Sequence, residues 1–442
     1  MTCLLIGLYK WCSPSVLPID CTMTIKQYLV DQAISARNRF EVSWPLRRLR
    51  GSAIAGVPDM PTRFAIIPAD MGNAIGSMGD LAMFTGLLQS LRTRNPDATF
   101  TIIGTRNHNL AVPGIGDVPV VAAWLGRAGS IAFDSVIRQN HALFVMGADI
   151  LDGKYGAALV ARIVGYCNHS VLLGIPATTL GFSFNSHPRS PAVHALSRLH
   201  PRVTVNVRDQ FSLDRFQQAT GIPASLCADS AFLMPPATAP EPEAEAWISS
   251  MRETGRSPVG VNLNAHALLP ALSKLGMDAL IAHLAQQLRI AGEASKLAFM
   301  LIPHDLKPQS GDMVMLQALE KQLRHNAFPH VRYTLINRPD AIKRVTGLLD
   351  LVITGRMHLA IASLGSGTPT LSITYQDKFE GLYQHFGLPI EHTITPMQCL
   401  GDALSIRIGR AHTQRHDLRK RICTSLPRVM TLASQNLVMA RN

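Results

Sequence analysis

Hydrophobic runs alternate with Gly-rich turns and amphipathic segments from residue 64 onward. The segment 64–70 (FAIIPAD) is predicted to be a buried strand, 72–80 (GNAIGSMGD) a Gly-rich turn, and 81–94 a helix with apolar residues at helical spacing. Further strand-like apolar runs follow at 99–104, 141–153, 170–184 and 201–209. Strand–turn–helix alternation of this kind predicts a doubly wound α/β domain with a mostly parallel sheet.

A proline- and glutamate-rich segment, 235–247, interrupts this alternation and is predicted to be a linker. The pattern then resumes, with a helix expected at 277–292 and strands at 259–264, 297–305, 331–338, 348–358 and 368–375. The chain is therefore expected to contain two doubly wound α/β domains. We divide it into a peripheral arm (1–60), an N-terminal domain (61–234), a linker (235–250), a C-terminal domain (251–400) and a basic helical tail (401–442).

The composition is that of a folded protein with anionic partners. The chain has 442 residues, of which 47% are hydrophobic and 16% charged, and its formal net charge is +12. This is enough apolar material for the cores of two or three domains. The positive balance favours nucleic acid, an anionic membrane surface, or phosphorylated and carboxylated substrates. Nucleic acid is not expected, because aromatic residues make up only 6% and no recognition motif is present.

The sequence predicts a cytoplasmic protein without a metal site. No apolar run reaches the ~18 residues of a membrane span, and the N-terminus lacks the basic lead of a secretory signal. The seven cysteines are scattered and include no CxxC pair. Two basic segments, 37–50 and 401–442, are either solvated surface or peripheral contacts with anionic membrane, and the second reading would place the protein at the inner face of the membrane.

Ligands of doubly wound sheets bind beyond the carboxyl ends of the strands, so polar residues directly after each apolar run are candidate site residues. In the N-terminal half these are Gly79, Asp80, Asp149, Asp152 and Arg208. The Gly-rich turn could bind an anion or be only a tight turn. Asp149 or Asp152 could accept a proton from a sugar hydroxyl, although Asp152 could equally be a cap. Arg208 suits a carboxylate or phosphate, or an ion pair with Asp209 or Asp214.

The C-terminal half contains the most informative candidates. Arg356 and His358 follow an apolar strand and open a helix, while Tyr375 and Lys378 follow the next strand. Arg, His and Lys side chains near one helix N-terminus would form a cationic pocket for a small molecule with several negative charges. The alternative is that all three are structural. His304, at the end of another strand, is either a site residue or a satisfied polar residue.

The segment 354–381 resembles the polysaccharide pyruvyl transferases. It carries their R-x-H, G-x-P and Y-x-x-K pattern as Arg356, His358, Gly367, Pro369, Tyr375 and Lys378, followed by Gly381. The likeness extends back to the turn that ends at Asp80 and covers about 64–390. The turn 72–80 is longer than the usual short form of the family, and the arm and the tail lie outside the pattern.

The resemblance implies a fold of the GT-B type, with a cleft between two Rossmann-like domains. It also implies transfer of the enolpyruvyl group of phosphoenolpyruvate to a sugar of an exopolysaccharide or cell-surface glycan precursor, free or lipid-linked, to form a pyruvate ketal. Phosphoenolpyruvate is the donor substrate, and no cofactor or metal is required. Arg356, Lys378 and Arg208 would hold its carboxylate and phosphate, with His304, Tyr375, Asp152, Gly79 and Asp80 as further binding residues.

A histidinium is a suitable acid near neutral pH, so His358 is the expected donor of the proton to C3 of phosphoenolpyruvate, or else a phosphate ligand, with His304 as second choice. Asp149 or Asp152 would orient or deprotonate the acceptor hydroxyl. One alternative is a glycosyltransferase or epimerase that uses a nucleotide sugar, with Glu380 as the candidate ribose ligand. Another is a non-catalytic glycan-assembly protein on the same fold.

Overall fold

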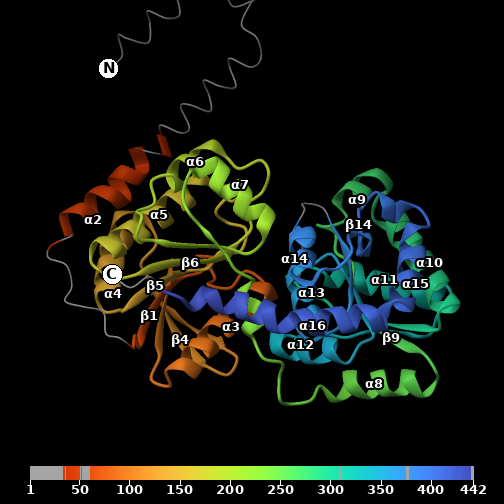
Figure 1. Ribbon diagram of the computed structural model, residues 1–442. Helices are drawn as coiled ribbons and strands as arrows, with labels where there is room; N and C mark the ends of the chain where they lie inside the picture. The colour runs from red at the N-terminus through yellow and green to blue at the C-terminus, as the bar shows by residue number, and fades with distance from the viewer. Residues whose placement is uncertain are drawn as a thin grey trace, which may run out of the picture.

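The computed structural model describes residues 33–34, 36–49, 51, 60–307, 311–374 and 378–439, apart from the side chains of Arg39 and Lys378. Figure 1 shows two α/β lobes side by side, each built around its own sheet. The predicted fold class, two doubly wound α/β domains, is confirmed.

The N-terminal domain contains an eight-stranded sheet in the order β3-β4-β2-β1-β5-β6-β7-β8. All neighbouring strands are parallel except the hairpin of β3 and β4 at one edge. The strands are β1 (Arg63–Ile67), β2 (Thr99–Gly104), β3 (His108–Val112), β4 (Gly116–Ala122), β5 (Ala142–Val145), β6 (Ala177–Phe182), β7 (Thr204–Val207) and β8 (Ser225–Leu226). The helices are η1 (Arg39–Ser43), α2 (Trp44–Leu49), α3 (Met78–Arg94), α4 (Gly126–Arg138), α5 (Ala157–Leu172), α6 (Ser190–Leu196), α7 (Gln210–Thr220) and η2 (Ser230–Leu233).

The C-terminal domain contains a six-stranded, fully parallel sheet in the order β11-β10-β9-β12-β13-β14. Its strands are β9 (Ser257–Asn262), β10 (Leu297–Leu301), β11 (Val331–Tyr333), β12 (Leu351–Thr354), β13 (Thr370–Ile373) and β14 (Thr393–Ile394). Its helices are α8 (Pro242–Glu253), α9 (Leu269–Leu275), α10 (Met277–Ala294), α11 (Met313–His325), α12 (Pro339–Gly347), α13 (Met357–Leu364), α14 (Lys378–Phe386), η3 (Ile390–His392), η4 (Gln398–Leu400), α15 (Ala403–Thr413), α16 (Arg415–Ser434) and η5 (Gln435–Leu437).

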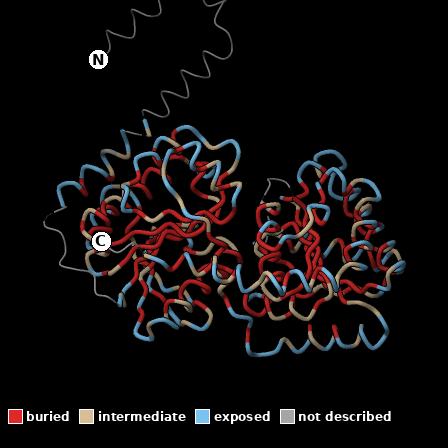
Figure 2. The backbone as a smooth tube through the Cα atoms, in the orientation of Figure 1, coloured by how far each residue is buried: buried red, intermediate tan, exposed pale blue. Residues whose placement is uncertain are grey.

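Alternate side chains of the central strands point to opposite faces of each sheet, and both faces are covered by apolar residues. Figure 2 shows the buried strands at the centre of each lobe. In β1, Ala65 and Ile67 face the core under α4 to α7, whereas Phe64 and Ile66 face the core under α3. Successive side chains of a strand point to opposite faces, so a strand covered by helices on both sides reads as one continuous apolar run. This is why the apolar runs of the sequence located the strands.

One of these cores is shared by the two domains. The core beneath α3 also includes side chains from α13, α14 and α16, among them Ile361, Phe379, Val429 and Ala433. The residues predicted as a basic helical tail form α15 and α16, and α16 runs from the second lobe to the first (Figure 1). Its C-terminal continuation, η5, contacts β6 of the N-terminal sheet. The interface is therefore an extended apolar contact.

Several sequence-based boundaries differ from the structure. The run 170–184 combines the end of α5 with β6, and the Gly-rich turn 72–80 ends in the first turn of α3. The hairpin β3–β4 was not predicted, because its strands alternate buried and exposed residues over only a few positions. Most of the predicted linker 235–250 is helical, since α8 begins at Pro242.

Among the residues that the structure describes, no helix is both long and apolar enough to span a bilayer.

Candidate active site

The turn from β12 to α13 positions the two main candidate residues. β12 is fully buried and ends at Thr354, whose hydroxyl accepts a hydrogen bond from the backbone N–H of Arg356 at 2.9 Å. Gly355 is required between them, because a Cβ there would lie 2.6 Å from the Cβ of Ala267. Arg356 is the N-cap residue of α13 and His358 lies in its first turn. Both side chains are partly open, with exposed fractions of 22% and 16%.

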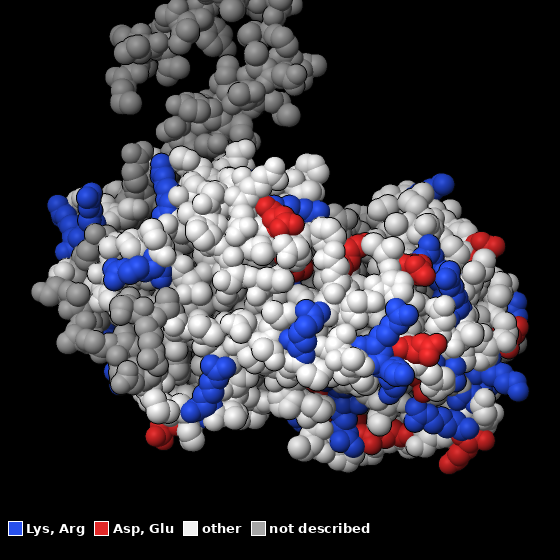
Figure 3. Space-filling model, viewed as in Figure 1, with Lys and Arg blue, Asp and Glu red and all other residues white. Residues whose placement is uncertain are grey.

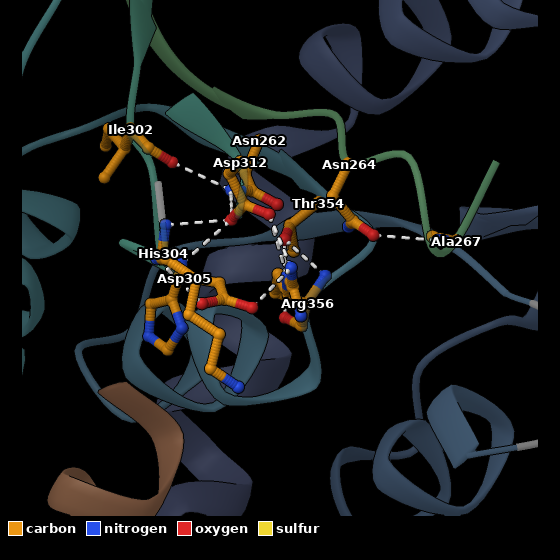
Figure 4. A network of polar contacts seen from close by, with 10 residues as sticks. Asn262, Asn264, Ala267, Ile302, His304, Asp305, Asp312, Thr354 and Arg356 are labelled. Atoms are coloured by element: carbon orange, nitrogen blue, oxygen red, sulfur yellow. Dashed lines mark hydrogen bonds and ion pairs between the residues drawn. The ribbon is translucent and has the colours of Figure 1, made fainter. Parts of the chain in front are cut away.

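Arg356 is paired with two carboxylates of its own domain (Figure 4). Its Nε and one terminal nitrogen donate to Asp312 Oδ1 at 3.0 and 2.6 Å, and the same terminal nitrogen donates to Asp305 Oδ2 at 3.2 Å. The guanidinium is thus held in a fixed orientation at the end of the strand. Its charge is largely balanced before any substrate binds.

Asp312 is the central acceptor of this network (Figure 4). It is fully buried, and its Oδ2 accepts hydrogen bonds from Asn262 Nδ2 and from the backbone N–H groups of His304 and Asp305 at 2.7, 2.9 and 3.1 Å. A buried carboxylate is tolerated only when its oxygens are satisfied in this way. Asp312 therefore ties together the ends of β9 and β10 and the turn after β12.

His358 reaches across the domain interface to α3. A Cβ on Gly79 would lie 2.1 Å from His358 Nδ1, so the imidazole packs directly against the bare backbone of Gly79 in the first turn of α3. Any larger residue at position 79 would displace the ring. Because His358 lies in the first turn of α13, the N-terminal ends of α3 and α13 meet at this histidine, and both ends favour negative charge.

The other ring nitrogen of His358 faces a buried ion pair. Its Nε2 lies 3.6 Å from Asp229 Oδ2, and Asp229 also accepts from Arg208 NH1 at 2.8 Å. Burial alone would raise the pKa of the Asp229 carboxyl, but the contact with His358 and the charge of Arg208 together hold its pKa well below the usual range. Asp229 is therefore an anion that faces the His358 ring.

Arg208, a predicted substrate ligand, is buried in the N-terminal domain. Besides Asp229, it donates from Nε to Ser183 Oγ at 2.8 Å, and only 4% of the residue is exposed. The ion-pair alternative considered for Arg208 named Asp209 or Asp214, and the observed partner is Asp229. Asp209 instead caps α7 by accepting from the backbone N–H of Ser212. Arg208 is therefore connected to His358 through Asp229.

Asp80 and Asp149 lie near one another on the N-terminal side of the site. Burial raises the pKa of the Asp80 carboxyl, the charge of His358 opposes this shift, and the charge of Asp149 adds to it. The Asp80 carboxylate accepts the backbone N–H of Gly76 at 3.0 Å and so closes the turn before α3. The predicted residues Gly79, Asp80 and His358 thus lie together at the domain interface, with Asp149 near Asp80. Arg356 is two residues before His358, and its ion pairs are with Asp305 and Asp312 of its own domain.

Two other predicted residues have local partners. Asp152 is buried and accepts hydrogen bonds from the backbone N–H of Lys154, at 2.9 Å, and from Asn185 Nδ2. It does not cap α5, whose N-cap residue is Gly156. His304 is 4% exposed, and its ring points away from Asp312 (Figure 4). Burial, reinforced by the charges of His358 and Arg356, lowers the pKa of His304 to about 3. His304 is therefore neutral at pH 7, which makes it a poor general acid in this state.

Tyr375 and the side chain of Lys378 lie outside the described part of the chain. Glu380, considered as a ribose ligand, is in the first turn of α14 and accepts from Thr374 Oγ1 at 3.0 Å. Within the described ranges, no group of three or more His, Cys, Asp or Glu side chains is arranged to hold a metal ion. The described cations Arg208 and Arg356 are both ion-paired. The cationic pocket expected from Arg356, His358 and Lys378 stays a prediction, because the Lys378 side chain is outside the described part of the chain.

Sequence reasoning missed three acidic residues of the site: Asp229, Asp305 and Asp312. Asp305 was next to His304 in the motif IPHD but was not singled out. Asp312 immediately precedes the helix α11, and Asp229 caps η2 by accepting from the backbone N–H of Ala231 at 2.9 Å. The available signal for both was an N-cap pattern, which identifies a helix start but not a distant arginine or histidine partner.

Solved structures with the same fold place the chain among GT-B proteins. HepE from Anabaena, in complex with UDP-glucose, matches with a TM-score of 0.52 and 12% identity, covering 85% of this chain and 98% of HepE. A putative UDP-N-acetylglucosamine 2-epimerase from Listeria monocytogenes matches with a TM-score of 0.52 and 10% identity, covering 86% and 98%. At these identities the likeness shows the fold alone.

The sequence comparisons concern the family. No curated protein matches the chain significantly. The family model described as "Polysaccharide pyruvyl transferase" matches residues 78–377, which include the turn at Gly79, the Asp229 and Asp312 carboxylates, and the R-x-H step at Arg356 and His358. Since the match spans well over half of the chain, the protein belongs to the polysaccharide pyruvyl transferase family.

Proposed function

We propose that this protein transfers the enolpyruvyl group of phosphoenolpyruvate to a sugar hydroxyl of an exopolysaccharide or cell-surface glycan precursor and forms a pyruvate ketal. The observation that carries the proposal is the position of His358, between the N-terminal ends of α3 and α13 and facing the buried carboxylate of Asp229. The two helix ends favour an anionic donor, and the carboxylate lies where it can orient the imidazole.

The reaction needs an acid before it needs a nucleophile. His358 gives a proton to C3 of phosphoenolpyruvate, and C2 then acquires oxocarbenium character. A sugar hydroxyl attacks C2 and passes its proton to a carboxylate, for which Asp149 is the candidate. A second hydroxyl of the same sugar then attacks C2 as the C2–O bond to phosphate breaks. The leaving phosphate takes the proton held by the carboxylate and departs as hydrogen phosphate. The proton of the second hydroxyl restores His358.

The geometry suggests which nitrogen donates the proton. Nε2 faces Asp229, so it is the nitrogen that the carboxylate orients, in the manner of a base positioned by a third group. Nδ1 lies against the backbone of Gly79 in the first turn of α3, whose N-terminal end favours an anion. We assign proton transfer to Nδ1 and orientation to Nε2. Arg356 would hold the donor's carboxylate or phosphate by exchanging part of its contact with Asp305, the longer of its two pairs.

The test measures phosphate release and acceptor mass for the purified full chain with phosphoenolpyruvate and a panel of mono- and oligosaccharides. His358→Ala should lower kcat by at least ~100-fold, the range of general acid catalysis. Arg356→Ala should weaken phosphoenolpyruvate binding in calorimetry. Arg324→Ala is the matched control, because Arg324 is an exposed arginine of the same domain that is also ion-paired, with Glu320.

Two outcomes would contradict the proposal. A fully active His358→Ala variant would exclude His358 as the acid. Calorimetric binding of UDP-glucose, with no binding of phosphoenolpyruvate, would favour the nucleotide-sugar alternative, which the GT-B fold also accommodates.

A further inference from the structure

Part of the predicted N-terminal arm is fixed to the first domain. Val42 and Leu46, on η1 and α2, are buried in the core under α4 and α5. Val42 packs against Gly165 of α5, where a Cβ would lie 2.7 Å from Val42 Cγ1. Glu41 forms an ion pair with the buried Arg162, and Arg138 donates to the carbonyl oxygen of Leu49 at 2.6 Å. The segment 39–49 therefore has one fixed orientation.

The opposite side of this segment exposes large hydrophobic side chains. Phe40 is 62% exposed and Trp44 is 41% exposed. Neighbouring α4 adds exposed Leu125 and Ile131, and the contacts between α2 and α4 place the two groups on one surface. We call this the α2–α4 surface; it consists of Phe40, Trp44, Arg47, Arg48, Leu49, Leu125, Arg127 and Ile131. Exposed aromatic and aliphatic residues grouped in this way mark an interaction site.

The α2–α4 surface is also cationic. The guanidinium carbons of Arg48 and Arg127 lie over the Trp44 ring at 3.9 and 4.9 Å from its centre, and Arg47 is exposed beside them. The nearest acidic residues are already neutralised, because Glu41 pairs with Arg162 and Asp134 pairs with Arg138 and His169. Figure 3 shows basic side chains along α2 at the left edge of the molecule with no acidic side chain next to them in that view.

We propose that the α2–α4 surface binds the interface of a membrane that contains anionic lipid. Tryptophan and other amphipathic rings prefer the headgroup region, and arginines near the surface are attracted by anionic headgroups. The basic helix α16, described throughout, exposes Lys420 and Arg421 but none of its large hydrophobic side chains. Positive charge alone does not distinguish α16 from the α2–α4 surface. The α2–α4 surface is preferred because it also exposes large hydrophobic side chains that can enter the headgroup region.

The test uses the full chain without substrate and measures co-sedimentation with vesicles of phosphatidylcholine, with or without 30% phosphatidylglycerol. We expect binding only to the anionic vesicles, and weaker binding in high salt. Arg47→Glu/Arg48→Glu should lower the partition constant at least ~10-fold, since two attracted guanidinium groups become two repelled carboxylates. Lys274→Glu/Lys321→Glu, an equal charge change at exposed lysines of the C-terminal domain, should change it less than about twofold.

A second measurement locates the contact. Tryptophan emission should be quenched by vesicles that contain brominated lipid, and Trp44→Phe should remove most of the quenching while binding persists. Equal thermal unfolding curves would show that the variants are folded.

Either of two results would overturn the proposal: no binding of the wild-type chain to anionic vesicles, or undiminished binding of Arg47→Glu/Arg48→Glu. If Lys420→Glu/Arg421→Glu abolished binding instead, α16 would be the membrane surface. Because the assay contains no donor or acceptor, its outcome is independent of the proposed pyruvyl transfer.

Discussion

At the scale of single residues, the site depends on the contact between a histidine of one domain and a glycine of the other. His358 could be predicted as a site residue because it follows a buried strand in the R-x-H step. The space that it occupies could not be predicted, since the imidazole fits only because Gly79 has no side chain. A glycine in a turn is usually assigned to backbone conformation, whereas Gly79 is needed for close packing.

Gly79→Ala should therefore damage catalysis more than folding. The added methyl group would lie 2.1 Å from His358 Nδ1 and must push the ring aside. We expect kcat to fall at least ~100-fold, as for other small displacements of catalytic groups, with a modest change in the unfolding midpoint. The measurement is phosphate release alongside urea unfolding.

The control for this substitution is Gly409→Ala in α15. Gly409 is also within a helix, but the nearest atom to an added Cβ would be Ser295 Oγ at 3.7 Å. This variant should keep full activity. If Gly79→Ala were equally active, the packing of His358 against α3 would have no catalytic role.

At the scale of elements, sequence patterns located most strands but did not predict which elements pack against one another. Apolar runs indicated β1, β2, β5, β9 and β10, because strands buried on both faces have no polar alternation. The role of α16 was not predictable, since its basic residues outnumber the four buried ones, Leu418, Ile422, Val429 and Ala433. The carboxylates of Asp229 and Asp312 were missed for a different reason, because their arginine and histidine partners lie far along the chain.

Asn436, in η5 just after α16, forms buried hydrogen bonds with the first domain. Asn436 is fully buried, accepts from the backbone N–H of Gly181 at 2.7 Å, and donates to the carbonyl oxygen of Ala228 at 2.8 Å. Asn436→Ala would leave both backbone groups unsatisfied and should lower the free energy of unfolding by about 2–4 kcal/mol. Urea unfolding measures this loss.

The neighbouring substitution Gln435→Ala removes an exposed amide and should change the free energy of unfolding by less than about 0.5 kcal/mol. Equal stability of the two variants would mean that α16 is held by its apolar contacts alone.

At the scale of the whole molecule, polar and apolar contacts hold the domains together at several points. Lys343, on α12 of the second domain, is buried and donates to the carbonyl oxygens of Phe232 and Met234 at 3.0 and 2.6 Å, where the first domain ends. Burial lowers the pKa of its ammonium group to about 8. A lysine with this environment makes the stability of the molecule depend on pH.

The sign follows from proton binding. In the unfolded chain a lysine has a pKa of about 10.4, so between about pH 8 and 10 the unfolded state binds more protons and stability rises with pH. Relative to Lys343→Met, the wild type should gain about 2 kcal/mol in unfolding free energy from pH ~7.5 to ~9.5. Urea unfolding at both pH values measures the difference.

Lys274→Met, at an exposed lysine, should show no such relative change. If the difference between wild type and Lys343→Met were constant with pH, the ammonium group would not be desolvated as the structure indicates.

The path of α16 also bears on how the protein is made. A ribosome synthesises the strands of the first sheet early, but Val429, Ala433 and Asn436 emerge only after the second domain. Until then, the apolar side of α3 and the backbone groups of Gly181 and Ala228 lack part of their cover. Chaperones would therefore be needed most while the first domain is nascent. Its folding is completed by residues that are translated after the second domain.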